Sequence, residues 1–468
     1  MILLRFTFSI FLVMIGSDAF GKLTLPSYFQ DHMVIQQLEI FKLKGTASPN
    51  AQVNVQWMDS TFYANATTDG NWELLLTSGP AGGPYSIIVK SGREKITVND
   101  ILIGDVWLCA GQSNMEWRAV QGLSSGMDEI EKANNSKIKL FNIPRNGCSI
   151  PQENIRGEWQ NCTSKHVKQF SAVGYFFGEK LQSALNIPIG LIYSTWGGTR
   201  IEYWMDEDTL SQDPQFSDLI ELKKSNVVGE KLNAFPSAIY NGMIYPLIDM
   251  PIKGVIWYQG ETNVDDALRY KALLPAMIES WRKAWQRDFD FYIVQIAPYK
   301  YDNPLEAVLI REAQLHASLN VPKTGLVVTT DIGDWNDIHP LNKLEVANRL
   351  SFLALNKTYG DTSVVACGPI FKSMSIVQRQ LFLDFENLNF TDDTFRPLLG
   401  FEVAGSDGIY HKANAFIRNN IVVVSCPEVS RPLNVRFGFN LQEVPNFFNE
   451  AGLPASPFRT DDWPLLIH

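Results

Sequence analysis

The strongest constraint on the fold is an alternation of apolar, strand-like runs with helical stretches, which begins near residue 101. The expected strands are 105–110, 137–142, 189–195, 254–258, 289–297 and 325–331. Apolar residues recur at helical spacing in 171–185, 267–285 and 342–355. Apolar strands that alternate with helices are typical of a parallel sheet covered by helices on both faces. We therefore predict a three-layer α/β/α domain over residues 101–356.

Shorter strand-like runs flank this region on both sides. On the N-terminal side they are 53–57, 72–76 and 85–89. On the C-terminal side they are 378–385, 401–403, 415–417 and 421–425. Short strands separated by turn-forming residues favour β-sandwich-like structure. We expect an N-terminal domain over residues 22–100 and a β-rich C-terminal domain over 357–468.

The composition excludes several classes of protein. The chain has 468 residues, of which 45% are hydrophobic, and its formal net charge is -10. That hydrophobic fraction is too high for a disordered chain, and an acidic chain has no general attraction to nucleic acid or to an anionic membrane. Beyond the N-terminus, no clean apolar run is long enough to cross a membrane. We expect neither nucleic acid nor membrane as a partner.

The N-terminus predicts entry into the secretory pathway. Arg5 precedes an apolar block at 6–15 and then small and polar residues up to Gly21, which is typical of a signal peptide over residues 1–21. Five Asn-x-Ser/Thr sequons agree with secretion and are candidate glycosylation sites: Asn65, Asn134, Asn161, Asn356 and Asn389. We expect a secreted or lysosomal glycoprotein.

The five cysteines fit an oxidising compartment. Cys109 lies in an apolar run and is expected to be a buried free thiol. The other four can pair in three ways. We favour a short loop closure, Cys148–Cys162, and a second disulfide in the C-terminal region, Cys367–Cys426.

The chemistry of such a domain is expected where its strands end, because ligands of an open α/β sheet bind beyond the carboxyl ends of the strands. Strand 105–110 runs into Gly111-Gln-Ser-Asn-Met115, which places Ser113 on a glycine-led turn before a helix. That position exposes a hydroxyl and aims backbone N–H groups at it, as a serine nucleophile requires. A Ser/Asn helix cap is the competing interpretation.

Three other strand ends carry complementary groups. Gly197 and Gly198 follow strand 189–195, where a backbone N–H could donate to an oxyanion. Gln259-Gly-Glu-Thr-Asn263 follows strand 254–258. The loop after 325–330 holds His339, together with three carboxylates that could orient the imidazole: Asp331, Asp334 and Asp337.

Serine, glycine, amide and histidine in this order at successive strand ends resemble the SGNH-hydrolase superfamily. More narrowly, Gly111-Gln-Ser-Asn114, Trp257-Tyr-Gln-Gly-Glu261 and Ile338-His-Pro340 resemble the sialate O-acetylesterase family. The resemblance implies an SGNH-type, flavodoxin-like α/β domain and a serine esterase that hydrolyses O-acetyl esters of sialic acids. It implies no metal and no other cofactor.

The resemblance also implies roles for single residues. Ser113 is the expected nucleophile and His339 the expected base. The oxyanion would be held by the N–H of Ser113, by the N–H of Gly197 or Gly198, and by a side-chain amide. For that amide the family pattern departs from the superfamily's usual asparagine, so Gln259 is our first candidate and Asn263 the alternative.

A second departure concerns the acid member of the triad. The superfamily places aspartate three residues before the histidine, where this chain has Asn336. An asparagine cannot stabilise an imidazolium as a carboxylate does. Either a Ser–His dyad operates, or a displaced aspartate serves, with Asp337 ahead of Asp334.

Substrate recognition is predicted from residues near these strand ends. Five aromatic side chains could stack on a sugar: Trp196, Tyr203, Trp204, Tyr258 and Trp335. Arg200 could pair with a sialic acid carboxylate, or instead with Glu202 or Asp206. Glu261 could contact the substrate or brace its loop.

Two other functions stay open at this point. The same site could act on another acetylated polysaccharide such as xylan, since the motifs belong to the acetyl chemistry and do not name the sugar. The chain could instead be a non-catalytic carbohydrate-binding protein, a hypothesis that Asn336 favours and that the pair of Ser113 and His339 opposes.

Overall fold

A computed structural model describes residues 21–226, 235–390, 395–439 and 444–465. Apart from Gly21, the predicted signal peptide lies outside these residues. The chain forms two compact units, and the last boundary between them along the sequence falls within one long strand, β7 (Glu94–Gly111). The first unit comprises the described residues up to Leu25, Lys42–Leu75 and Ser86–Val98, and the second comprises the rest. The predicted domain boundaries at residues 100 and 356 stay a prediction.

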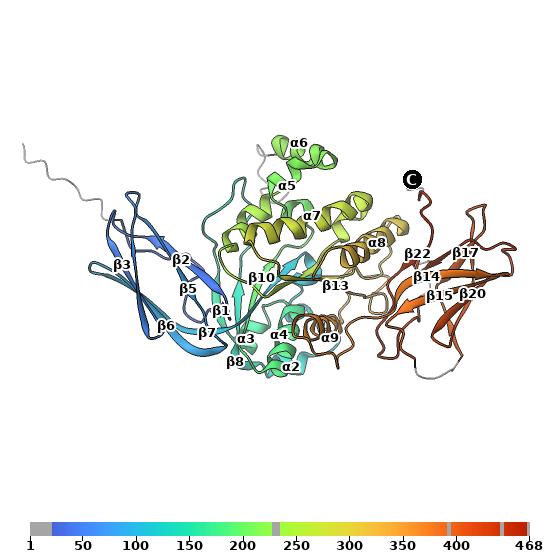
Figure 1. Ribbon diagram of the computed structural model, residues 1–468, viewed down its shortest axis with the longest axis horizontal. Helices are drawn as coiled ribbons and strands as arrows, with labels where there is room; N and C mark the ends of the chain where they lie inside the picture. Colours follow the sequence, from blue (N-terminus) through green and yellow to red (C-terminus); the bar gives the residue numbers. More distant parts are fainter. Residues whose placement is uncertain (1–20, 227–234, 391–394, 440–443, 466–468) are drawn as a thin grey trace, which may run out of the picture. The chain divides into compact units, whose positions relative to one another are not determined.

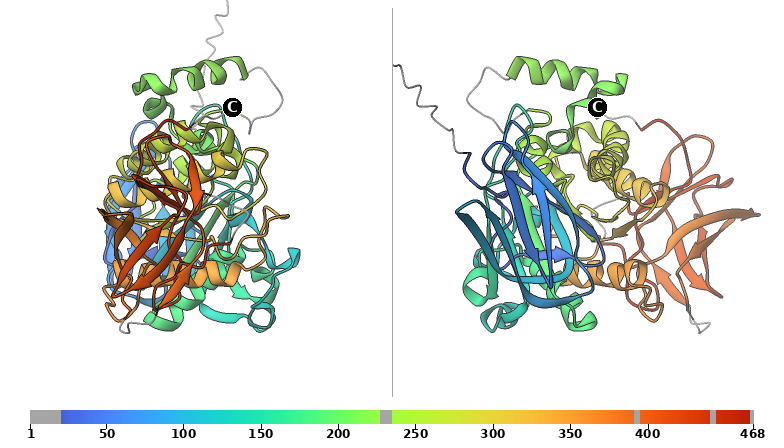
Figure 2. Two further views of the ribbon diagram at one scale, coloured as in Figure 1. Left: turned by 90° about the vertical axis from the view of Figure 1, so that its right-hand side faces the viewer. Right: turned by 60° about the vertical axis from the view of Figure 1, so that its left-hand side comes forward.

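The first unit is built from antiparallel strands. Strand β3 (Gln52–Trp57) pairs with β4 (Ser60–Asn65) and with the end of β6 (Gly82–Ser91), and β2 (Ile40–Thr46) pairs with β5 (Asn71–Thr77). These are the blue strands in the right view of Figure 2. Val53, Val55 and Trp57 alternate with more exposed residues along β3 and are all buried. This alternation gives β3 one apolar face, as expected for a β-rich region.

The second unit contains the predicted sheet, which is parallel except at one edge. Its strand order is β13-β12-β11-β7-β10-β8-β9, and only β9 runs antiparallel to its neighbour. The strands besides β7 are β8 (Asn134–Asn142), β9 (Glu158–Thr163), β10 (Ile189–Thr195), β11 (Gly254–Tyr258), β12 (Asp290–Val294) and β13 (Thr324–Val327). A short strand, β1 (Val34–Gln36), also pairs parallel to β7. The α/β class predicted from the alternation is confirmed.

Helices cover the two faces of this sheet (Figure 1). One face carries α4 (Ala172–Leu185) and α9 (Lys343–Leu353), and the other carries α7 (Ala267–Trp285) and α8 (Pro304–Asn320). The sequence pattern predicts all of these except α8. Consecutive residues of α8, from Ala307 to Arg311, are buried, so its sequence lacks the one-sided apolar spacing that reveals a surface helix. Among the described residues, no helix is long and apolar enough to cross a membrane.

The remaining helices of the described chain are short. They are α1 (Ser113–Glu116), α2 (Met127–Glu131), α3 (Ser164–Val167), α5 (Glu207–Gln212) and α6 (Ser217–Asn226). The first of them, α1, follows directly on β7 and contains the predicted nucleophile.

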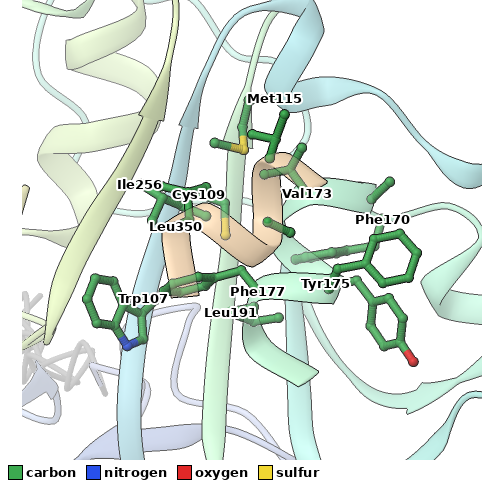
Figure 3. Close-up of a cluster of buried hydrophobic side chains, with 14 of the residues drawn as sticks. Trp107, Cys109, Met115, Phe170, Val173, Tyr175, Phe177, Leu191, Ile256 and Leu350 are labelled. Atoms are coloured by element: carbon green, nitrogen blue, oxygen red, sulfur yellow. The ribbon is translucent and has the colours of Figure 1, made fainter. Parts of the chain in front are cut away.

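Two glycines let α4 lie close against the middle of the sheet. A Cβ atom at Gly174 would lie 2.9 Å from Cys109 Sγ, and one at Gly178 would lie 2.6 Å from Leu191 Cδ1. Beside them, Phe177 packs edge-on against Trp107, with 5.0 Å between the ring centroids (Figure 3). Cys109 is a buried free cysteine, as predicted, and burial raises the pKa of its thiol.

The C-terminal part of the second unit is β-rich, as predicted. One antiparallel sheet contains β14 (Ile370–Val377), β15 (Gln380–Glu386), β20 (Ile421–Ser425), β19 (Asn414–Arg418) and β16 (Arg396–Leu398). Another contains β18 (Tyr410–Lys412), β17 (Phe401–Ala404), β21 (Asn434–Phe437) and β22 (Phe458–Arg459). Apolar residues of both sheets, including Val403 and Val422, form one core (orange strands in Figure 2, left).

The two predicted disulfides are wrong for this structure, because all five cysteines are free. The backbone of Cys148 bonds to Ala238 and Asn241, whereas Cys162 lies in the apolar core beside the sheet. Cys367 Sγ accepts a hydrogen bond from Asn387, whereas Cys426 Sγ bonds to the carbonyl of Lys412. Each predicted partner thus contacts a different part of the chain.

The sequons differ in how accessible their side chains are. Asn65, Asn134 and Asn389 are exposed. Asn161 is half-buried and accepts a hydrogen bond from Lys139 Nζ, and Asn356 Nδ2 donates to the carbonyls of Asp361 and Val364. The side chains of Asn65, Asn134 and Asn389 are thus more accessible than those of Asn161 and Asn356.

A close approach of three strands fixes the turn after β7. Gly111 pairs with Thr195 of β10 on one side and with Tyr258 of β11 on the other. Its φ is +135°, and a Cβ atom there would lie 2.2 Å from the Tyr258 carbonyl oxygen. Only glycine fits this position, so the turn into α1 depends on it.

Gly111→Ala is therefore expected to lower the free energy of unfolding by about 2–4 kcal/mol, since strain adds to a backbone clash. Gly360→Ala is the matched control, because Gly360 has a φ of +75° with open space around its Cβ position. Strain alone predicts a loss of about 1–2 kcal/mol there. Urea denaturation of both variants checks this, and equal losses would contradict the clash at Gly111.

Candidate active site

The predicted site residues meet at the carboxyl edge of the sheet, around the end of β7. Strand β7 lies between β10 and β11, and all three run parallel. The Trp196 N–H donates to Gly111 O, and the Gln112 N–H donates to Tyr258 O. These contacts draw the loops after β10 and β11 against the first turn of α1, where Ser113 lies. Such a crevice is where ligands bind in open α/β sheets.

Ser113 and His339 are in direct contact although 226 positions separate them in sequence. The distance between Ser113 Oγ and His339 Nε2 is 2.9 Å. Trp117 stacks on the imidazole, with 5.1 Å between centroids and 26° between the ring planes. This geometry allows the imidazole to accept the hydroxyl proton, which is what activates a serine nucleophile.

The surroundings of the imidazole favour its neutral form. Burial and then the nearby Lys343 ammonium lower the pKa of His339 below its ordinary 6.5, against the opposing effect of the Asp337 carboxylate. A neutral imidazole is the form that accepts a proton. The histidine is therefore suited to act as a base at and below neutral pH.

Among the three aspartates of the His339 loop, Asp337 is the one beside the imidazole. Its Oδ1 lies 3.6 Å from His339 Nδ1 and accepts the His339 backbone N–H at 2.8 Å. A separation of 3.6 Å is too long for a hydrogen bond to the ring but short enough for an ion pair. Asp334 instead accepts the Asn336 N–H, and Asp331 forms two 2.7 Å bonds to Arg349.

A buried network connects the nucleophile segment to the histidine loop through Asn114. Asn114 Nδ2 donates to Glu261 Oε1 at 2.5 Å and to the carbonyl of Ile338 at 3.0 Å. Its Oδ1 accepts from Lys343 Nζ at 2.5 Å. Because Ile338 precedes His339 and Asn114 follows Ser113, this one amide links the segments that carry Ser113 and His339.

The two charged members of this network are shielded from solvent. Lys343 is fully buried and Glu261 is 6% exposed. Burial raises the pKa of Glu261 and lowers that of Lys343 to about 7, although nearby carboxylates oppose the second shift. The Glu261 carboxylate thus bonds to Asn114 inside this network rather than facing solvent.

The candidate oxyanion donors differ in what they already bind. The Gly197 N–H donates to Glu116 Oε2 at 2.7 Å. Gln259 Nε2 donates to Thr199 O and to Asn263 Oδ1, and Asn263 Nδ2 donates to Glu202 Oε2. Both amide hydrogens of Gln259 are thus used inside the loop.

Two backbone donors near the serine stay available. Within the described part of the chain, the N–H groups of Ser113 and Gly198 have no hydrogen-bond acceptor. Gly198 is exposed and adopts a φ of +72°, with no atom near its Cβ position. A ligand can therefore reach the backbone there.

The predicted substrate residues are only partly free to act. Arg200 binds Glu202 Oε1 at 2.8 Å and Asp265 Oδ1 at 2.9 Å, and lies 3.7 Å from Asp266. Of the aromatic candidates, Tyr258 and Trp204 are buried core residues, whereas Trp196, Trp335 and Tyr203 are partly exposed.

Four residues of the site carry no predicted role: Asn114, Glu116, Trp117 and Lys343. Trp117 and Lys343 lie four residues after Ser113 and His339, but neither pair shares a helix, so helical spacing does not indicate them. Asn114 and Glu116 form hydrogen bonds with residues of other loops, which no local sequence pattern indicates. In the ranges described here, no group of three His, Cys, Asp or Glu side chains could hold a metal ion.

Comparison with known families agrees with this geometry. Residues 103–347 match the family model described as carbohydrate esterase, sialic acid-specific acetylesterase. That range contains Ser113, His339, Asn114 and Lys343.

Comparison with single proteins agrees as well. The solved structure of a carbohydrate acetylesterase from Xanthomonas citri is 36% identical, with a TM-score of 0.85, over 94% of this chain and 100% of that one. The sialate O-acetylesterase of Homo sapiens is 29% identical over 401 residues, 76% of this chain and 75% of that protein. That of Rattus norvegicus is 27% identical over 430 residues, 78% of each chain.

The lowered pKa of His339 predicts the pH dependence of the reaction. The neutral base persists to lower pH, so kcat/KM for 4-nitrophenyl acetate should begin to fall below pH 6.5. Lys343→Met removes a positive charge that disfavours the imidazolium, and should move this fall to higher pH. A purely structural role for Lys343 would lower kcat and leave the pH of the fall in place.

The Asn114 network predicts a defect in turnover without loss of binding. Asn114→Ala should lower kcat by about 10²-fold, because small displacements of reacting groups cost about that much. KM should stay within about twofold. Asn336→Ala, in the His339 loop but outside the network, is the control and should keep wild-type kcat. A normal kcat in Asn114→Ala would contradict the positioning role.

Proposed function

Because this chain belongs to the sialic acid-specific acetylesterase family of carbohydrate esterases, we propose that it hydrolyses the O-acetyl esters of sialic acids. The observation that carries the mechanism is the 2.9 Å contact between Ser113 Oγ and His339 Nε2 at the carboxyl edge of the sheet. The family and this contact together support a serine esterase that acts on an acetylated sugar.

The reaction proceeds through an acetyl-enzyme. His339 takes the Ser113 proton as Oγ attacks the acetyl carbonyl carbon, and the resulting tetrahedral intermediate expels the sugar oxygen, which receives that proton from His339. Water then attacks the acetyl-enzyme with His339 again as base. Acetate leaves, and Ser113 regains its proton.

The oxyanion is held by backbone donors in this proposal. The unoccupied N–H groups of Ser113 and Gly198 support it, since a donor without an internal partner can turn to the developing charge. Gly197 serves only if its N–H leaves Glu116. The amide of Gln259 or Asn263 supports the loop.

The imidazolium is stabilised by charge rather than by a third hydrogen bond. The 3.6 Å separation between Asp337 Oδ1 and His339 Nδ1 supports an ion pair that forms when the ring is protonated. We therefore propose a Ser–His dyad assisted by Asp337, with Trp117 holding the plane of the ring.

The secretory location remains part of the proposal. The signal peptide pattern and the exposed sequons at Asn65, Asn134 and Asn389 support a glycoprotein that is secreted or lysosomal. Such a location would bring the enzyme to the sialylated glycans that are its proposed substrates.

Acetate release from 9-O-acetyl-N-acetylneuraminic acid tests the proposal. The wild-type chain should release acetate, and Ser113→Ala should reduce the rate by about 10⁴-fold or more. Cleavage of 4-nitrophenyl acetate and acetylated xylan without release from the sialic acid would move the substrate to another polysaccharide. No turnover of any ester, with no fluorophosphonate labelling of Ser113, would favour the carbohydrate-binding function.

A further inference from the structure

A pocket of about 920 Å³ lies beside the Ser113–His339 pair, and the proposed mechanism does not use it. Glu116, the last residue of α1, forms part of its wall together with Tyr193 and Thr195 of β10. A Cβ atom at Gly197 would lie 2.9 Å from Glu116 Oε2 and 3.2 Å from Ser113 Cβ. One glycine thus separates the wall of this pocket from the nucleophile.

The pocket concentrates positive charge in an acidic chain. Three cationic side chains line it, Arg118, Arg145 and Lys165, against two carboxylates, Glu116 and Glu158. The whole chain has a formal net charge of -10. An excess of cations at the edge of a catalytic centre attracts an anionic ligand, because nearby charge raises its local concentration.

Two arginines converge on the single carboxylate of Glu116. Arg145 Nη2 donates to Glu116 Oε1, and Arg118 Nη2 lies 4.0 Å from the same oxygen. The Glu116 side chain is 11% exposed, whereas Arg145 and Arg118 are 49% and 41% exposed. The carboxylate is therefore covered, whereas both arginine side chains are partly exposed and line the pocket.

Further contacts hold these arginines ready for a ligand. The Arg145 guanidinium lies over the Trp196 ring, 5.8 Å from its centroid. Arg118 Nε is buried and has no acceptor among the residues that the structure describes. A partly exposed guanidinium group suits a carboxylate, which can accept two parallel hydrogen bonds from it.

The other candidate for this role, Arg200, is already neutralised. Its guanidinium is surrounded by Glu202, Asp265 and Asp266, so the group carries excess negative charge. An anionic ligand would be repelled there.

We propose that this pocket binds the carboxylate of an acidic sugar, with Arg145 and Arg118 as the recognising groups. The enzyme thereby prefers acidic over neutral acetylated sugars. The inference rests on the proposed function only in that the acetyl ester must reach Ser113 while the carboxylate is held. Sialic acids and uronic acids share the required chemistry.

Binding to the full wild-type chain tests the pocket without any turnover. Titration calorimetry would compare N-acetylneuraminate, its uncharged methyl ester and glucuronate. Loss of a charge-assisted contact predicts at least about tenfold weaker binding of the methyl ester. Glucuronate shows whether the pocket accepts any sugar carboxylate or only that of a sialic acid. Equal binding of acid and ester would overturn the proposal.

Variants test which residues cause the preference for the acid over its methyl ester. Arg145→Gln and Arg118→Gln should each weaken acid binding by about tenfold and leave ester binding within about twofold, while Arg145→Lys should keep part of the preference. Arg379→Gln, on an exposed arginine far along the chain, is the matched control. Equal weakening of acid and ester in Arg145→Gln, or loss of the preference in Arg200→Gln alone, would overturn the assignment.

The hydrolysis assay separates this inference from the proposed function. Suppose that the acid preference is present and depends on Arg145, but 9-O-acetyl-N-acetylneuraminic acid is not hydrolysed. The pocket assignment is then supported and the proposed substrate is contradicted. Suppose instead that this ester is hydrolysed as fast as its methyl ester analogue and that binding shows no preference for the acid. The proposed function is then supported and the pocket assignment is contradicted.

Discussion

The active site depends on the pairing of β7 with a parallel strand on each side. Parallel neighbours end at the same edge, so Thr195 and Tyr258 both lie beside Gly111. The backbone bonds from Trp196 to Gly111 and from Gln112 to Tyr258 then continue this pairing into the loops. Residues that are distant in sequence, Trp196 and Gly111 in one bond and Gln112 and Tyr258 in the other, are brought together by backbone hydrogen bonds before any side chain contributes.

Side chains then add what the sheet cannot provide, which is the position of the histidine loop. His339 follows β13, and two strands separate β13 from β7 in the sheet. The gap is bridged by Asn114, whose amide uses both its donor and its acceptor sides. A buried amine and a buried carboxylate are expensive in free energy, and they are retained here where they fix geometry. The presence of Glu261 and Lys343 is explained by their effect on the position of the histidine loop more than by a gain in stability.

The sequence alone predicts the class of the fold and the strand ends at which Ser113 and His339 lie, because both leave local patterns. Apolar strands alternate with helices, and Ser113 and His339 each follow such a strand. Helix α8 left no such pattern, since burial on several sides removes the polar face. The disulfides failed because sequence spacing carries no information on which element each cysteine packs against.

Sequence motifs do not reveal that the side chains of Gln259 and Arg200 are already hydrogen-bonded within the protein. Gln259 and Arg200 are of the right type and lie in the right loops, yet their hydrogen bonds are used internally. Whether a polar group is free for substrate depends on neighbours that are distant in sequence, such as Asp265 for Arg200. A single sequence gives no measure of that.

Glu116 connects the two halves of the site. One of its oxygens accepts the Gly197 N–H beside Ser113, and the other holds Arg145 at the pocket. Without this carboxylate the two pocket arginines would repel each other, and the Gly197 N–H would lose its acceptor. In the proposed binding mode a sugar carboxylate would bind the donors of Arg145 that Glu116 leaves unused. Glu116 therefore lies between the proposed pocket and the backbone that borders Ser113.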